Sequence, residues 1–108
     1  MTHYCFDIDG TICTNTFGEY ARAEPLDEAI EHVNRLFLRG HEITLFTARG
    51  TTTGIDWRGE TEAQLKRWGV LHHRLILGKP NADYYIDDRA VSATDWHETW
   101  NLPETPVS

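Results

Sequence analysis

The chain has 108 residues and a formal net charge of −7, and 40% of its residues are hydrophobic. This length allows one compact domain with a modest core, and the composition is that of a globular protein rather than a disordered segment. The acidic balance argues against nucleic acid as a general partner, because phosphate backbones are bound by clustered Lys and Arg.

Neither a membrane anchor nor an export signal is recognisable in the sequence. No stretch approaches the roughly 18 apolar residues of a membrane span, and Asp7 and Asp9 interrupt the apolar run near the N-terminus. The two cysteines are Cys5 and Cys13, and we expect no disulfide between them. We therefore expect a cytoplasmic protein that does not bind a membrane.

Four short runs are typical of strands. They are rich in aromatic and β-branched residues and are bounded by polar residues, Gly or Pro. They occur at residues 3–8, 42–46, 73–77 and 83–87.

Helix signals lie between these strands. Pro25 suits a first helical turn and Gly40 a helix end, so one helix is expected between them. A second helix is expected at residues 57–68, with Asp56 as its N-cap and Gly69 at its end.

The alternation of strands and helices, with a third helix expected near residues 90–100, predicts an α/β fold. We expect a parallel sheet covered by helices on both faces, in three layers of the Rossmann-like type. Residues 1–101 are expected to form one domain, and residues 102–108 a frayed tail. Right-handed crossovers would place the carboxyl ends of the strands along one edge, where α/β folds bind ligands.

Asp7 and Asp9 stand at the end of the first predicted strand. Because alternate residues of a strand point the same way, the two carboxylates should leave the strand together. Crowded carboxylates repel one another unless a cation or a shared proton relieves them, and Mg²⁺ prefers such oxygen ligands. The alternative interpretation is that Asp9 and Gly10 form only a turn.

Polar side chains also stand at the ends of later strands. Thr47 and Arg49 follow the second strand, and Asp87 and Asp88 end the last one. Since polar groups that end successive parallel strands converge on one crevice, we expect these side chains to join Asp7.

Four ordered motifs make the chain similar to a known superfamily. They are Asp7-x-Asp9-Gly10-Thr11, residues 45–49 (LFTAR), residues 78–80 (GKP) and residues 85–88 (YIDD). In this order, and at or beside predicted strand ends, they resemble the motifs of the haloacid dehalogenase superfamily. The first motif carries two aspartates, as it does in the phosphatase branch of that superfamily, which the chain resembles.

The resemblance implies a phosphatase mechanism with defined roles. Asp7 would be the nucleophile that forms an aspartyl-phosphate, and Asp9 would be the general acid and then the base that activates water. Mg²⁺ would be held by Asp7, by the backbone carbonyl of Asp9, and by Asp87 or else Asp88. Asp88 has an alternative role, because it could cap the following helix or pair with Arg89.

Further residues would bind the phosphate itself. Thr47 would donate its hydroxyl to a phosphoryl oxygen, and Lys79 would supply a positive charge. Backbone N–H groups near Gly10 and Ala48 would complete the anion site. The alternatives are that Thr47 caps a turn and that Lys79 is a solvated surface lysine.

The chain has no room for a cap domain like those of larger members of the superfamily. Residues 12–24 form only a short flap, and residues 50–78 are used by a loop, a helix and a strand. The loop at 50–58 is the first candidate for substrate contacts, and the flap is the second. The expected contacts from the loop and its neighbour are Arg49, Thr51 and Trp57, and those from the flap are Asn15, Thr16 and Tyr20.

The resemblance to small members without a cap favours a sugar or polyol phosphate as substrate, and the open site favours a homo-oligomer. Nucleotide or macromolecular phosphates stay open as substrates. A non-enzymatic phospho-accepting switch is the alternative from another class. Receiver domains of that kind combine similar residues, but their acidic pair comes first in the chain and their phosphorylated Asp stands alone on a later strand. Here Asp7-x-Asp9 comes first, and the adjacent acidic pair, Asp87 and Asp88, comes last.

Overall fold

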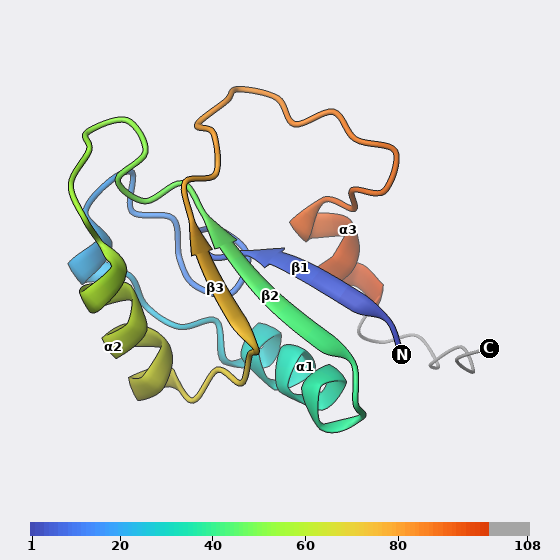
Figure 1. The fold of residues 1–108 in the computed structure, drawn as a ribbon. Coiled ribbons are helices and arrows are strands. Elements are labelled where there is room, and N and C mark those ends of the chain that lie inside the picture. The colour runs from blue at the N-terminus through green and yellow to red at the C-terminus, as the bar shows by residue number, and fades with distance from the viewer. Residues whose placement is uncertain (100–108) are drawn as a thin grey trace.

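The computed structural model describes residues 1–99, which form a three-stranded parallel sheet packed against helices (Figure 1). The strands are β1 (His3–Asp7), β2 (Glu42–Thr47) and β3 (Arg74–Leu77), and β2 is central. The helices are α1 (Asp27–Leu38), α2 (Arg58–Trp68) and α3 (Ala93–Glu98), and a short 3-10 helix, Tyr20–Arg22, precedes α1.

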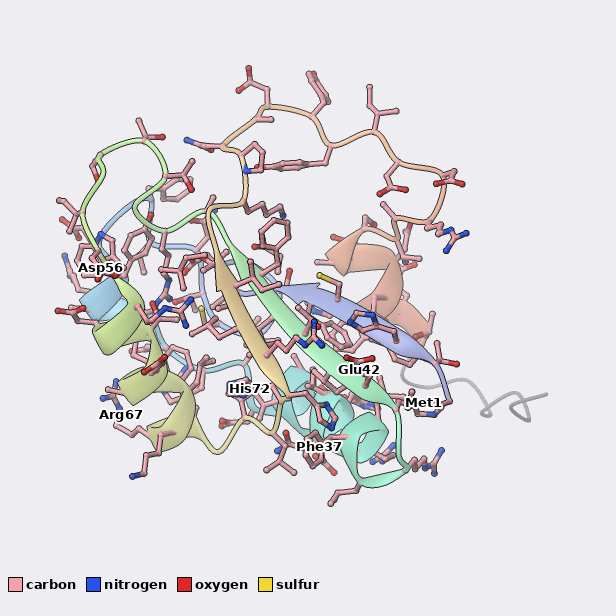
Figure 2. All side chains as sticks on the ribbon, in the orientation of Figure 1. Met1, Phe37, Glu42, Asp56, Arg67 and His72 are labelled. Atoms are coloured by element: carbon pink, nitrogen blue, oxygen red, sulfur yellow. The ribbon has the colours of Figure 1, made fainter. Side chains whose placement is uncertain are left out.

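The helix ends follow the expected signals. Gly40, two residues beyond α1, has a φ of 91°, and Gly69, which caps α2, has a φ of 70°. Both are left-handed conformations that glycine adopts readily. Trp57 rather than Asp56 holds the N-cap position of α2, yet the Asp56 carboxylate accepts a hydrogen bond from the Arg58 N–H at 3.0 Å. Figure 2 labels Asp56 at this first turn.

The strand predicted at residues 83–87 is wrong. The segment is irregular, and Tyr84 and Ile86 are 84% and 96% exposed. Local contacts of Tyr85 hold it out of a strand: its hydroxyl donates to the Pro80 carbonyl (2.5 Å) and accepts from the Ala82 N–H (3.1 Å). These bonds connect residues 80, 82 and 85 with one another and not with the sheet.

The core lies on one face of the sheet. Its strand residues are Tyr4 and Phe6 from β1, Ile43 and Leu45 from β2, and Leu75 from β3. Phe6, Leu45 and Leu75 are in register across the three strands. They pack in one cluster with Ile30 and Val33 of α1, Leu65 of α2 and, at its margin, Trp96 of α3.

The opposite face of the sheet is largely open in the described part of the chain, where Cys5, Arg74 and Ile76 are exposed. The expectation of helices on both faces is therefore not met within residues 1–99, because α1, α2 and α3 all contribute to the cluster on the first face. The parallel α/β sheet itself is confirmed. The expected tail at 102–108 lies outside the described residues. Over residues 1–99, no helix is long and apolar enough to cross a membrane.

Replacing Leu45 by Ala should destabilise the fold by about 2–5 kcal/mol, since the side chain is 0% exposed at the centre of the sheet. Leu38→Ala is the matched control, because Leu38 is 76% exposed and its loss should cost less than about 0.5 kcal/mol. Urea unfolding followed by circular dichroism measures both changes. Equal effects would contradict this location of the core.

Candidate active site

The carboxyl ends of the three strands bring Asp7, Thr47 and Lys79 together. Asp7 ends β1, Thr47 ends β2, and Lys79 lies two residues beyond β3. The Lys79 N–H donates to the Thr47 carbonyl at 3.1 Å, and the Lys79 ammonium lies 3.6 Å from Asp7 Oδ1. Residues of the first, second and third predicted motifs therefore meet at one edge. Figure 2 labels Phe37 and His72 near the other end of the sheet, where the strands begin.

Two features of its environment shift the pKa of Asp7 in opposite directions. Partial burial raises the pKa of Asp7, and the positive charge of Lys79 opposes that effect without cancelling it. The Asp7 side chain is still 37% exposed. A ligand can therefore reach this carboxyl.

Lys79 is held rather than freely solvated. Its side chain is 18% exposed, and its ammonium lies 4.2 Å from the centre of the Tyr85 ring, which is a cation–π contact. The Thr51 hydroxyl donates to the Lys79 carbonyl at 2.8 Å. Thr51, which we expected to contact substrate, thus fixes the backbone that carries Lys79.

Asp9 is bound by Arg49 in a two-point ion pair. Arg49 Nε donates to Asp9 Oδ2 at 3.0 Å, and Nη2 donates to Oδ1 at 2.9 Å. The Arg49 side chain is 0% exposed and that of Asp9 is 18% exposed. Such paired, charge-assisted hydrogen bonds are strong and hold both groups in one geometry.

Polar residues from other elements surround the guanidinium of Arg49. Nη1 donates to Thr61 Oγ1 (3.2 Å) and to Gln64 Oε1 (2.6 Å), both on α2. The Tyr20 ring lies over its central carbon at 4.7 Å. Burial alone would lower the pKa of Arg49, but the hydrogen bonds and charge of Asp9 outweigh it and raise that pKa. Arg49 was expected to contact substrate, and the structure places its guanidinium inside the protein instead.

Gly10 and Thr47 use their polar groups in local turns. Gly10 has a φ of 84°, and its N–H donates to the Cys13 carbonyl at 2.9 Å, so this N–H is already used within the protein. Thr47 is 1% exposed, and its hydroxyl accepts from the Arg49 N–H at 3.1 Å. Its oxygen therefore caps a turn, although the hydroxyl still carries a proton to donate.

The loop after β2 turns tightly beside the flap. A Cβ on Gly50 would lie 2.1 Å from the Ile55 carbonyl oxygen and 3.1 Å from the Trp57 ring, so only glycine fits there. The Ala48 carbonyl accepts from the Thr51 N–H at 3.0 Å. Trp57 packs edge-on against Tyr20 at 5.0 Å between ring centres. Trp57 thus joins this loop to the flap.

Asp87 and Asp88 do not join the other carboxylates. Both are exposed, because the predicted strand that would have carried them to the sheet edge is not formed. A hydrogen bond from the Arg89 N–H (2.9 Å) lowers the pKa of Asp87, and Asp88 lowers it further. Within residues 1–99, no group of three or more His, Cys, Asp or Glu side chains could hold a metal ion. Asp7 and Asp9 therefore lack the third carboxylate that the sequence led us to expect.

Several residues of this site were not anticipated from the sequence. Thr61 and Gln64 are buried polar residues on the core side of α2, next to Leu65, and that placement was the available signal. Cys13 lies against the ion pair, with its sulfur 3.5 Å from Asp9 Oδ1. Tyr85 was assigned to a strand and instead contacts Lys79.

Comparison with models of protein families and with curated proteins finds no match. Among solved structures, a target protein from Vibrio cholerae matches with a TM-score of 0.80 and 27% identity, over 89% of this chain and 87% of that chain. A chain of a Pnkp1/Rnl/Hen1 complex matches with a TM-score of 0.58 and 18% identity, over 91% of this chain and 32% of that one. The second likeness concerns the fold alone. The first extends over most of both chains.

The two thiols should differ in reactivity. Burial and the nearby charge of Asp9 raise the pKa of Cys13 to about 12, so at pH 8 only about one molecule in ten thousand carries its thiolate. Cys5 is exposed. We expect iodoacetamide at pH 8 to modify Cys5 in the folded protein and Cys13 only in denaturant, as measured by mass spectrometry. Cys5→Ser isolates Cys13, and rapid labelling of this variant while folded would contradict the packing beside Asp9.

Proposed function

We propose that this protein is a phosphatase of the haloacid dehalogenase superfamily that hydrolyses phosphate monoesters through an aspartyl-phosphate on Asp7. The observation that carries the proposal is the accessible Asp7 carboxylate with the Lys79 ammonium 3.6 Å from it. The four ordered sequence motifs support the same activity. A nucleophile beside a fixed cation is the arrangement that phosphoryl transfer needs.

The reaction would take place in two displacements. In the first, an Asp7 oxygen attacks phosphorus, the ester P–O bond breaks, and the departing alkoxide takes a proton from Asp9. In the second, water attacks the aspartyl-phosphate, its proton passes to Asp9, and the bond between phosphorus and Asp7 breaks. Lys79 would offset the negative charge of Asp7 and of the phosphoryl group in both steps.

We propose Mg²⁺ as the cofactor, whose chemistry would be to neutralise the phosphate and polarise its oxygens. Asp7 and a carbonyl are suitable ligands, but a third carboxylate would have to come from Asp87 or Asp88. The described residues do not place these near Asp7 and do not by themselves form a metal site. Phosphate release measured with Mg²⁺ and with EDTA tests this metal dependence.

The proposed substrate is a small sugar or polyol phosphate, in a cytoplasmic enzyme that forms a homo-oligomer. Between β1 and α1 the described chain has only a short flap with one 3-10 turn, so no inserted domain covers Asp7 from that side. A neighbouring subunit could then serve as a lid. Nucleotide and macromolecular phosphates are the competing substrate classes.

Asp7→Asn should abolish phosphate release, a loss of about a thousand-fold or more, because the nucleophile is removed. The assay uses an aryl phosphate and a panel of sugar, polyol and nucleotide phosphates, with Mg²⁺ and with EDTA. Asp83→Asn is the matched control, since Asp83 is exposed in the loop after Lys79. We expect metal-dependent release by the wild type and the control only. A stable phosphoprotein without turnover would favour the phospho-accepting switch instead.

Lys79→Met should lower kcat by about 100-fold and raise KM as well, because the cation would contact the phosphoryl group in both the ground and transition states. Lys66→Met is the matched control, since Lys66 is exposed in the last turn of α2. Steady-state kinetics with the best substrate of the panel measures both constants. Unchanged kinetics for Lys79→Met would contradict the role of Lys79.

A further inference from the structure

The guanidinium of Arg49 is fully used within the protein. Arginine has five N–H donors. Two bind Asp9, two bind Thr61 and Gln64, and Nη2 also lies 3.9 Å from the sulfur of Cys13. The side chain is 0% exposed. Arg49 therefore has neither a free donor nor a surface with which to bind a substrate.

The orientation of Arg49 is set by α2 and by the flap. Thr61 and Gln64 hold Nη1 from α2, and the Gln64 amide in turn donates to the Tyr20 carbonyl at 2.6 Å. The Tyr20 ring covers one face of the guanidinium. Contacts other than those with Asp9 thus fix the plane of the guanidinium. The two parallel N–H bonds from Arg49 then fix the plane of the Asp9 carboxylate.

The Asp9 carboxylate stays partly accessible in this position. A carboxylate has about four lone-pair directions. Arg49 occupies one on each oxygen, and the Cys13 thiol donates to Oδ1 at 3.5 Å. The Asp9 side chain is 18% exposed, so one side of it reaches solvent. The ion pair consequently restricts where the carboxylate points without closing it off.

We propose that Arg49 is a positioning residue that fixes the Asp9 carboxylate for proton transfer, and that Gln64 of α2 fixes Arg49. This inference rests on the proposed phosphatase function, in which Asp9 serves the leaving group and the attacking water. Arg49 acts only through Asp9 and touches neither substrate nor phosphate. It follows that its effect on the rate depends on Asp9 being present.

The test is a double-mutant cycle in kcat, with Arg49→Gln, Asp9→Asn and the double variant. We expect Arg49→Gln to lower kcat about 100-fold, as misplacing a catalytic group does, and to change KM less than about 3-fold, because binding contacts are untouched. In the Asp9→Asn background the same substitution should change kcat less than about 2-fold. Arg49→Lys should not restore kcat, because an ammonium cannot make two parallel bonds.

Two further variants serve as an independent test and as a control. Gln64→Leu retains the Arg49 side chain but removes one of the hydrogen bonds that orient it. It should lower kcat by about 3- to 10-fold, again only when Asp9 is present, and it provides the same test if Arg49→Gln does not fold. Arg35→Gln, which removes a surface ion pair with Glu31 (3.5 Å), should leave kcat and KM unchanged. Circular dichroism and urea unfolding establish that each variant is folded.

The outcomes separate the two proposals. If the wild type is active but Arg49→Gln raises KM, or lowers kcat by the same factor with and without Asp9, the positioning role of Arg49 is wrong and the proposed phosphatase function is unaffected. A wild type without phosphatase activity removes the basis of both proposals.

Discussion

The charge of Arg49, buried beside the core, organises the segments around the candidate site. Removing a guanidinium from water is costly unless each donor finds an acceptor and the charge finds a partner. Here the loop after β1 supplies the Asp9 carboxylate, and α2 supplies Thr61 and Gln64. These segments must converge on one guanidinium, which explains why polar side chains of α2 are buried at the edge of an otherwise apolar cluster. Gln64 also donates to the Tyr20 carbonyl, so the same group of contacts holds the flap against α2.

Asp7 and Asp9, two residues apart in the chain, form ion pairs of different exposure. The Asp9–Arg49 pair is largely buried, with its atoms 2.9 Å apart. The Asp7–Lys79 pair is more exposed and longer, at 3.6 Å. A short buried pair is a rigid structural element, whereas a longer and exposed pair can exchange its partner for a ligand. Asp7 is the last residue of β1 and Asp9 lies two residues further on, so the buried pair anchors the chain directly after the strand end that carries Asp7.

Much of the fold and part of the site could be predicted from the sequence. Periodicity and the glycines at positions 40 and 69 located β1, β2, β3 and the helices, and parallel topology accounts for the meeting of Asp7, Thr47 and Lys79. The inward turn of Arg49 could not be read in the same way, because an arginine after a strand end has the same sequence pattern whether it meets a ligand or α2. The segment at 83–87 has the composition of a strand, but the hydrogen bonds of Tyr85 are local and leave it irregular.

The contacts of Tyr85 also bear on how positive charge is supplied to Asp7. The loop that Tyr85 closes holds its ring 4.2 Å from the Lys79 ammonium, so the same segment that keeps Asp87 and Asp88 away from the sheet edge holds Lys79 near it. If residues 83–87 extended to bring a third carboxylate to Asp7, the Tyr85 bonds to Pro80 and Ala82 would have to break. Metal binding by Asp87 or Asp88 together with Asp7 would therefore be coupled to this placement of Lys79 through one loop. Because binding energy must offset the lost contacts, a cation would bind more weakly than it would to a preformed site.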